Sequence, residues 1–261
     1  MSRARSRLGT THSLLTASSP GGRTARTTGR TNYPGRRRPG PGRGGHGPEV
    51  PISTPTPASW AYAENFVDED DVLARARARG DELGCRGVRP GVGATLCLLA
   101  AAGGARSVVE IGTGAGVSSV YLLRGMPADG VLTTIDVEAE NQRAARQAFS
   151  EAGIRPNRTR LITGRALDVL PRLTDRAYDL VLLDAETAEY DAYTDQALRL
   201  LRRGGVLAVV DALWRGKVAD PAQRDRTTTT MRELGKRVRD DARLVPALLP
   251  VGDGLLLAVV R

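Results

Sequence analysis

A glycine-rich turn between an apolar run and a helical segment is the part of this sequence best suited to chemistry. The segment Val108–Ser119 reads VVEIGTGAGVSS, with Gly112, Gly114 and Gly116 at alternate positions. Glycine tolerates positive φ and lets a ligand approach bare backbone. In open α/β sheets, ligands bind at the carboxyl ends of strands, and the first such turn is the usual place. The turn therefore predicts a ligand site at the end of the first strand.

Two carboxylates near this turn narrow the choice of ligand. Asp136 ends the next apolar run, VLTTIDVE, 20 residues beyond Gly116, where a carboxylate can accept hydrogen bonds from both hydroxyls of a ribose. Glu110 stands two residues before Gly112. Such a carboxylate repels a pyrophosphate but attracts a cationic ligand that carries an ammonium group. The residues favour a nucleoside cofactor, and they favour S-adenosylmethionine over NAD.

Short apolar runs alternate with helical segments around this turn. The expected strands are Ser107–Ile111, Val131–Ile135, Thr159–Ile162, Leu180–Leu183 and Val206–Val210. The expected helices cover Asp68–Gly84, Ala94–Ala102 and Glu138–Ala152, and others begin near Val117, Ala166 and Ala188. Continuously apolar strands separated by helices imply a parallel sheet that is covered on both faces.

The C-terminal segment breaks this alternation. Leu244–Leu249 and Leu255–Val260 flank the turn sequence PVGDG, which is typical of an antiparallel hairpin. The expected fold class is therefore α/β. We predict a Rossmann-like, doubly wound and mostly parallel seven-stranded sheet that ends in an antiparallel hairpin, with helices on both faces.

Charge divides the chain into two parts. Of 38 basic and 29 acidic residues, 10 Arg and Glu49 lie in residues 1–57, so residues 58–261 carry 28 of each and are neutral. The first part is rich in Gly and Pro and lacks hydrophobic periodicity, which predicts a disordered extension. The alternatives are a translation start assigned too early, or an arm that contacts nucleic acid or acidic lipid. Residues 58–261 are expected to form the folded domain.

Residue types exclude several chemistries in that domain. Both histidines, His12 and His46, lie in the extension, which excludes a Ser-His-Asp triad, a His-ligated zinc and an imidazole base. Cys85 and Cys97 are too few for a disulfide scaffold or a four-thiolate metal site. No apolar run approaches the roughly 20 residues of a membrane span. We expect a soluble, cytoplasmic protein.

Five strings of the domain carry a resemblance to a known family. They are EIGTGAGVS, TTIDVE, ITGRALDVLPRL, YDLVLLDAETAEY and GGVLAVVDALWRG. From Trp60 to Arg261, in order and spacing, the chain resembles the catechol and caffeoyl-CoA O-methyltransferase family of class I S-adenosylmethionine-dependent methyltransferases, especially its bacterial members. The resemblance implies methyl transfer from S-adenosylmethionine to a hydroxyl of a small, aromatic, catechol-like acceptor. It also implies a homodimer.

The resemblance assigns cofactor contacts to matching positions. The ribose is expected at Asp136 and the adenine at Ala166, while Glu186 stands where the family usually has an Asp near the methionine part of the cofactor. The full set of expected cofactor residues is Val88, Glu110, Gly112, Thr113, Gly114, Gly116, Ser118, Asp136, Ala166, Asp184 and Glu186. The alternative interpretations are simple packing at Val88 and Ala166, and helix capping at Asp136.

At the reacting end the sequence departs from the family. The family binds two neighbouring hydroxyls to a divalent metal held by an Asp after strand four and an Asp-Asn pair after strand five, with a Lys as base. Here Asp184 matches the first ligand, Val210-Asp211 replaces the pair, and Thr187 replaces the lysine. Asp184 and Asp211 are the catalytic candidates, and with water and substrate they are also candidate ligands of Mg²⁺ or another divalent cation. The alternatives for Asp211 are a metal-free general base and a capping acid.

Several functions stay open at this stage. Trp214 follows strand five, where a loop can cover the acceptor, and is the candidate substrate residue. The substitutions at Thr187 and Val210 leave room for a protein that binds the cofactor without turnover. The basic extension leaves room for an RNA-modifying methyltransferase. An NAD-dependent oxidoreductase is disfavoured by the G-x-G-x-G spacing.

Overall fold

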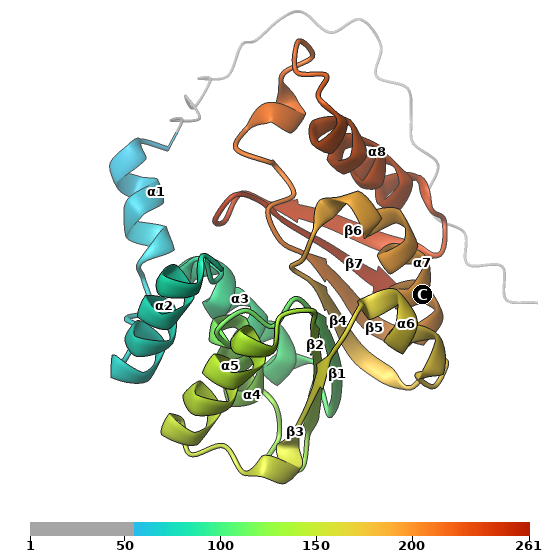
Figure 1. Cartoon of the computed structure of the whole chain (residues 1–261). Coiled ribbons are helices and arrows are strands. Elements are labelled where there is room, and N and C mark those ends of the chain that lie inside the picture. Colours follow the sequence, from blue (N-terminus) through green and yellow to red (C-terminus); the bar gives the residue numbers. More distant parts are fainter. Residues whose placement is uncertain (1–54) are drawn as a thin grey trace, which may run out of the picture. The chain divides into compact units, whose positions relative to one another are not determined.

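A seven-stranded sheet with the order β3-β2-β1-β4-β5-β7-β6 organises the computed structural model (Figure 1). Strands β1 to β5 are parallel, β7 pairs antiparallel with β5, and β6 pairs antiparallel with β7. The strands are β1 Ser107–Ile111, β2 Val131–Asp136, β3 Thr159–Thr163, β4 Tyr178–Leu183, β5 Leu201–Val209, β6 Leu244–Leu249 and β7 Leu255–Val260. The predicted fold class, including the C-terminal antiparallel hairpin, is confirmed.

The structure describes residues 55–261. The predicted extension, residues 1–57, lies almost wholly outside the described residues and stays a prediction. The α-helices that follow are α1 Pro57–Glu64, α2 Asp71–Leu83, α3 Pro90–Ala102, α4 Val117–Gly125, α5 Ala139–Glu151, α6 Ala166–Val169, α7 Tyr190–Leu200 and α8 Arg226–Asp240. Short 3₁₀ turns cover Pro156–Arg158, Leu170–Arg172, Thr187–Glu189 and Lys217–Ala219. None of the helices in this part of the chain combines the length and apolarity needed to cross a bilayer.

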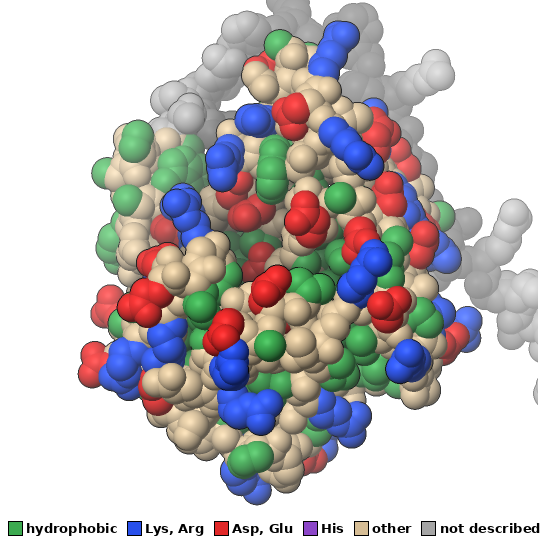
Figure 2. Space-filling view, viewed as in Figure 1, with side chains coloured by type: hydrophobic (Ala, Val, Ile, Leu, Met, Phe, Trp, Pro, Cys, Tyr) green, Lys and Arg blue, Asp and Glu red, His purple; other side chains and the backbone are tan. Residues whose placement is uncertain are grey.

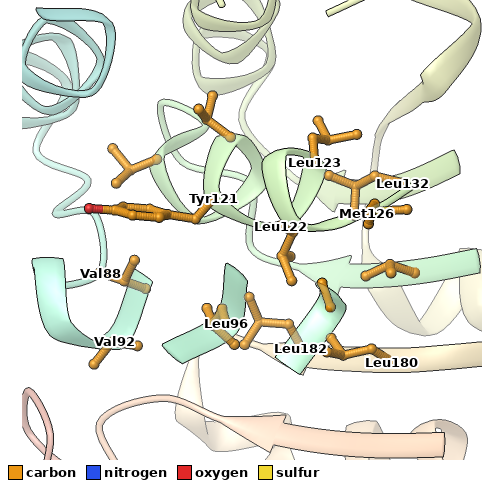
Figure 3. Close-up of a cluster of buried hydrophobic side chains, with 14 of the residues drawn as sticks. Val88, Val92, Leu96, Tyr121, Leu122, Leu123, Met126, Leu132, Leu180 and Leu182 are labelled. Atoms are coloured by element: carbon orange, nitrogen blue, oxygen red, sulfur yellow. The ribbon is translucent and has the colours of Figure 1, made fainter. Parts of the chain in front are cut away.

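The helices cover both faces of the sheet, as predicted. On one face α2, α3, α4 and α5 contribute to one buried apolar cluster, and on the other face α6, α7 and α8 contribute to a second (Figure 1). Figure 3 shows part of the first cluster, where Val88 and Val92 lie near the ring of Tyr121. That ring passes so close to Gly93 that a Cβ there would lie 2.3 Å from it. This packing holds α3 against α4, and α4 begins at the glycine turn.

Local signals explain where the helices begin and end. Asp70 caps α2 by accepting a hydrogen bond from the Leu73 N–H at 3.1 Å, and Gly84 ends that helix in the left-handed conformation. Helix α3 begins at Pro90, one turn earlier than predicted, because proline fits the first helical position although it breaks a helix interior. Helix α8 was not predicted, because four consecutive threonines at residues 227–230 interrupt the apolar pattern at its start.

Candidate active site

A cleft of about 530 Å³ opens at the carboxyl ends of β1, β2, β3 and β4. Its lining includes residues 84–87 between α2 and α3, residues 112–115 after β1, residues 136–138 after β2, Gly164 and Ala166 after β3, and residues 184–186 after β4. Figure 2 shows this face of the molecule, with acidic side chains in and around a central hollow. The cleft lies where the sequence predicted a ligand site.

The glycine turn lets the ends of β1 and β4 approach each other closely. Gly112 has a φ of +93°, and a Cβ on it would lie 1.8 Å from the carbonyl oxygen of Asp184. Only glycine fits this position. Gly114 also has a positive φ of +50° and lines the cleft. Gly116 does not line it: this residue is the N-cap of α4, and a Cβ there would meet Ala145 at 3.0 Å.

Asp136 organises the glycine turn and also faces the cleft. Its Oδ2 accepts hydrogen bonds from the backbone N–H groups of Thr113 at 3.0 Å and Gly114 at 2.9 Å. Its Oδ1 accepts from the Glu138 N–H at 2.9 Å and from the Asn141 side chain at 3.2 Å. The carboxylate is thus fixed at the end of β2, the position expected for an acid that binds ribose.

Glu110 lies beneath the cleft rather than in its lining. The side chain is 0 % exposed and accepts hydrogen bonds from Ser118 at 2.6 Å, from Thr134 at 2.6 Å and from Ser119. Burial raises the pKa of Glu110 to about 7, although the three hydroxyl donors oppose the rise. Ser118 lines the cleft, and its hydroxyl proton is committed to Glu110. The Ser118 oxygen therefore presents only lone pairs to a ligand, which suits an ammonium donor.

Asp184 and Asp211 mark the predicted reacting end. Asp184 lines the cleft, and burial, followed by the negative charges of Asp211 and Glu110, raises its pKa to about 8. Asp211 lies beyond the cleft lining, at the start of the loop after β5, with a φ of +55°. Asp211 is an exposed residue, yet desolvation of its carboxylate and the nearby Asp253 raise its pKa, against the effect of Arg89 and Arg215. The two acids are close enough to interact electrostatically.

The donors at this end do not fit the metal site that the resemblance implies. Within residues 55–261, no three His, Cys, Asp or Glu side chains are grouped as metal ligands would be. Val210 stands where the family has a carboxylate, and it is 3 % exposed and packed in the first apolar cluster. A valine cannot ligate a cation, so two carboxylates remain. No catalytic step is assigned to a metal here.

Several other predicted site residues lie outside the cleft lining. Val88 is buried in the first apolar cluster (Figure 3), and its carbonyl accepts a hydrogen bond from Arg77 at 2.7 Å. Trp214 is half-buried beside the second cluster, with a φ of +48°, and its N–H donates to the Asp211 carbonyl at 2.9 Å. The cleft does bring together Gly112, Thr113, Gly114, Ser118, Asp136, Ala166, Asp184 and Glu186.

Sequence reasoning missed some residues of the cleft. Cys85 and Arg86 line it from the segment before α3, and Asn141 and Tyr193 line it from α5 and α7. The pair Gly84 and Gly87 brackets the first segment and was an available signal. Asn141 lies in the first turn of a correctly predicted helix, directly after the strand that ends at Asp136. Tyr193 follows the fourth strand, near the expected acceptor, but an aromatic on an amphipathic helix more often belongs to the core, so this position alone did not single it out.

The sheet order and the cleft define a Rossmann-like methyltransferase. A glycine turn follows β1, and Asp136, the acid at the position expected to bind ribose, ends β2. An antiparallel C-terminal hairpin, β6 and β7, completes the sheet. A family model described as O-methyltransferase matches residues 73–261. The chain belongs to this O-methyltransferase family. The predicted family and enzyme class are thereby confirmed.

Named relatives agree with this assignment. A probable O-methyltransferase of Mycobacterium tuberculosis is 51% identical over 212 residues, which is 81% of this chain and 95% of the relative. The O-methyltransferase TomG of Streptomyces achromogenes, involved in tomaymycin synthesis and solved with S-adenosylmethionine, has a TM-score of 0.69 and 31% identity, covering 77% of this chain and 94% of its own. An O-methyltransferase of Bacillus cereus, solved with S-adenosylhomocysteine, has a TM-score of 0.70 and 27% identity, covering 78% and 97%.

Proposed function

We propose that this protein transfers the methyl group of S-adenosylmethionine to a hydroxyl of a small, aromatic, catechol-like acceptor. The observation that carries the proposal is the row of oxygen acceptors along one cleft. Asp136 suits the ribose hydroxyls, Ser118 suits the ammonium group, and Asp184 suits the positive sulfonium end. The cofactors held by TomG and by the Bacillus cereus enzyme support the same assignment.

The remaining cofactor contacts follow from the same cleft. Gly112, Thr113 and Gly114 offer bare backbone beside the methionine part, and Ala166 offers a small surface for the adenine. Glu186 extends this acidic lining near the methionine end. Glu110 and Gly116 act from below, by orienting Ser118 and by starting α4, and Val88 supports the wall through packing.

The acceptor chemistry is assigned to Asp211 and Asp184. A phenol with an ordinary pKa near 10 must lose its proton as the methyl group moves. The raised pKa of Asp211 makes its carboxylate a stronger base than an aspartate of ordinary pKa. Asp211 accepts the proton, the oxygen–carbon bond forms as the carbon–sulfur bond breaks, and the cofactor leaves as a neutral thioether. Asp184 faces the sulfonium, and Trp214 stands on the loop beside the acceptor.

The wider assignments are proposed on the sequence and the family resemblance. They are a catalytic domain of residues 58–261, a basic extension of residues 1–57, a homodimer and a cytoplasmic location. Every residue of the proposed chemistry lies in residues 58–261.

Two experiments test the proposal. Isothermal titration of S-adenosylmethionine and S-adenosylhomocysteine should show binding of both, and absence of both would refute the proposed cofactor. Methylation of a panel of catechols, flavonoids and hydroxylated nucleosides, assayed with Mg²⁺ and then with EDTA, should give a methylated catechol under both conditions. Loss of turnover in EDTA would refute the metal-free role of Asp211. Cofactor binding without any methylated product would favour a binding protein.

The substitution Asp211→Asn tests directly whether Asp211 is the general base. It should lower kcat by roughly 100-fold or more, because the amide cannot accept the proton. Affinity for S-adenosylmethionine should stay within about twofold, since Asp211 lies outside the cofactor cleft.

A further inference from the structure

Among the described residues, one carboxylate of helix α1 makes the side-chain hydrogen bonds that join this helix to the rest of the domain. Every residue of Pro57–Ala63 is exposed, and only Glu64, the last residue of the helix, is partly buried. The Glu64 Oε1 accepts a hydrogen bond from the Gly91 N–H at 2.9 Å, and its Oε2 accepts from the Gly252 N–H at 2.9 Å. The two oxygens of one side chain therefore join two segments that are 161 residues apart in the sequence.

The first of these bonds completes the start of α3. Arg89, at the cap position of α3, makes no side-chain hydrogen bond to the helix. The Gly91 N–H is one of the unpaired donors at that helix start, and a carboxylate is favoured there by the helix dipole. Glu64 thus supplies from another helix the cap that α3 lacks.

The second bond fixes the turn between β6 and β7. Gly252 has a φ of +59°, and a Cβ there would lie 2.5 Å from Val92 of α3. The next residue, Asp253, accepts through its carbonyl a hydrogen bond from the Leu213 N–H at 2.8 Å, and its side chain accepts from the Arg215 N–H. The Gly254 carbonyl accepts from the Ala212 N–H at 2.9 Å. The turn therefore holds the loop after β5 by three backbone donors.

That loop carries an unusual concentration of left-handed backbone. Asp211, Trp214 and Arg215 have φ values of +55°, +48° and +56°. Such conformations are unfavourable for residues other than glycine and persist only where surrounding contacts impose them. The β6–β7 turn provides those contacts, and Glu64 holds the turn. Asp211 and Trp214 are the residues to which the proposed function assigns the acceptor.

We propose that Glu64 is a positioning residue of the acceptor site: by joining α1, the start of α3 and the β6–β7 turn, it fixes the left-handed loop that presents Asp211 and Trp214. The inference rests on the proposed function, since it gives the acceptor side of that reaction its geometry. It assigns Glu64 no contact with the cofactor cleft, whose lining it does not join.

The test compares Glu64→Ala and Glu64→Gln with the control Glu82→Gln. Glu82 is an exposed residue of α2 for which the described residues offer no side-chain hydrogen bond, so its substitution makes the same chemical change at a neutral place. Amide hydrogen exchange is measured on the full chain with S-adenosylmethionine bound. Loss of Glu64 directly frees the Gly91 and Gly252 amides. The inference requires that exchange also accelerate at Leu213 and Arg215, which Glu64 does not touch.

Kinetics supply the second arm of the test. Glu64→Ala should raise the acceptor KM about tenfold, because both hydrogen bonds of the carboxylate are lost and the loop that presents Asp211 and Trp214 is no longer held in one conformation. Affinity for S-adenosylmethionine should stay within about twofold. Glu64→Gln, which keeps one acceptor oxygen, should give a smaller rise in the acceptor KM than Glu64→Ala. Unchanged exchange at Leu213 and Arg215 would overturn the inference, and so would a fall in cofactor affinity as large as the rise in acceptor KM. If the wild-type protein methylates no acceptor, the proposed function fails while the exchange arm still decides this inference.

Discussion

Glu110 is a carboxyl group that water does not reach, and its titration should be visible in the stability of the protein. Burial raises the pKa of Glu110 to about 7, above its ordinary value of 4.5. Between those two pH values the unfolded chain releases the Glu110 proton while the folded chain retains it. The free energy of unfolding should therefore fall as pH rises from about 4.5 to about 7, by up to ~3 kcal/mol, and this contribution should be constant above that range.

The substitution Glu110→Gln removes this dependence. Urea denaturation of both proteins from pH 4.5 to 8.5 should show the stability difference moving in favour of the variant up to about pH 7. The exposed substitution Glu82→Gln should show no such drift. A difference between wild type and Glu110→Gln that stays constant with pH would mean that Glu110 ionises normally in the fold.

Gly112 is irreplaceable on steric grounds. A Cβ at this position would lie 1.8 Å from the Asp184 carbonyl oxygen, and the φ of +93° is strained for any other residue. Gly112→Ala should lower the free energy of unfolding by more than about 2 kcal/mol and abolish measurable cofactor binding. Thermal denaturation and calorimetric titration measure the two effects.

A glycine elsewhere provides the matched control. Gly235 lies inside α8, and a Cβ there would meet no atom within 4 Å. Gly235→Ala should stabilise the protein by up to about 1 kcal/mol, because alanine favours the helix. Similar behaviour of the two variants would show that the close approach at Gly112 is relaxed in solution.

At the scale of elements, one side chain of α8 holds the segment between β5 and α8. The Arg232 guanidinium donates hydrogen bonds to four backbone carbonyls, those of Lys217, Val218, Asp220 and Gln223, at 3.0–3.2 Å. A lysine keeps the charge but cannot reproduce this planar fork. Arg232→Lys and Arg232→Ala should both accelerate amide exchange in residues 217–223, with the larger effect in the alanine variant. Equal exchange in all three proteins would show that the segment is held by other contacts.

The sequence predicted the central parallel strands well, because β1, β2 and β4 are largely buried on both faces and read as mostly apolar runs. The predicted Ser107–Ile111 matches β1, and the hairpin Leu244–Leu249 with Leu255–Val260 matches β6 and β7. Strand β5 begins at Leu201, five residues earlier than predicted, because Arg202, Arg203 and two glycines interrupt its apolar pattern. Helix α1 was not predicted, since it buries no side chain and so has no apolar face to detect.

The candidate site was predictable to the extent that it follows from strand ends. The turn after β1 and Asp136 after β2 lie where the strand order alone puts them. The contributions of Cys85 and Tyr193 depend on how helices pack over the cleft, and that information is spread over many residues. The hydrogen bonds of Glu64 could not be foreseen, because they join segments that sequence patterns treat as unrelated.

At the scale of the whole molecule, the charge of the chain and the chemistry of the domain are separable. Residues 58–261 carry equal numbers of acidic and basic residues, so the excess of basic charge lies in residues 1–57. Removal of residues 1–54 should leave the affinity for S-adenosylmethionine within about twofold, as measured by calorimetric titration. If the full chain binds RNA, that binding and its salt dependence should fall in the shortened chain. A loss of cofactor affinity would show that the domain extends further toward the N-terminus than proposed.

The committed hydroxyl of Ser118 has a consequence for turnover. In the function we propose, the Ser118 oxygen accepts a hydrogen bond from the amino group of the cofactor, which the reaction leaves unaltered. The demethylated by-product therefore keeps this contact in full and lacks only the methyl group and the positive charge on sulfur. Release of the by-product must then depend on the acids assigned to the sulfur end, Asp184 and Glu186. These acids attract a sulfonium cation but do not attract a neutral thioether. The enzyme is accordingly expected to be sensitive to inhibition by its own spent donor, and removal of that by-product would govern its flux in a cell.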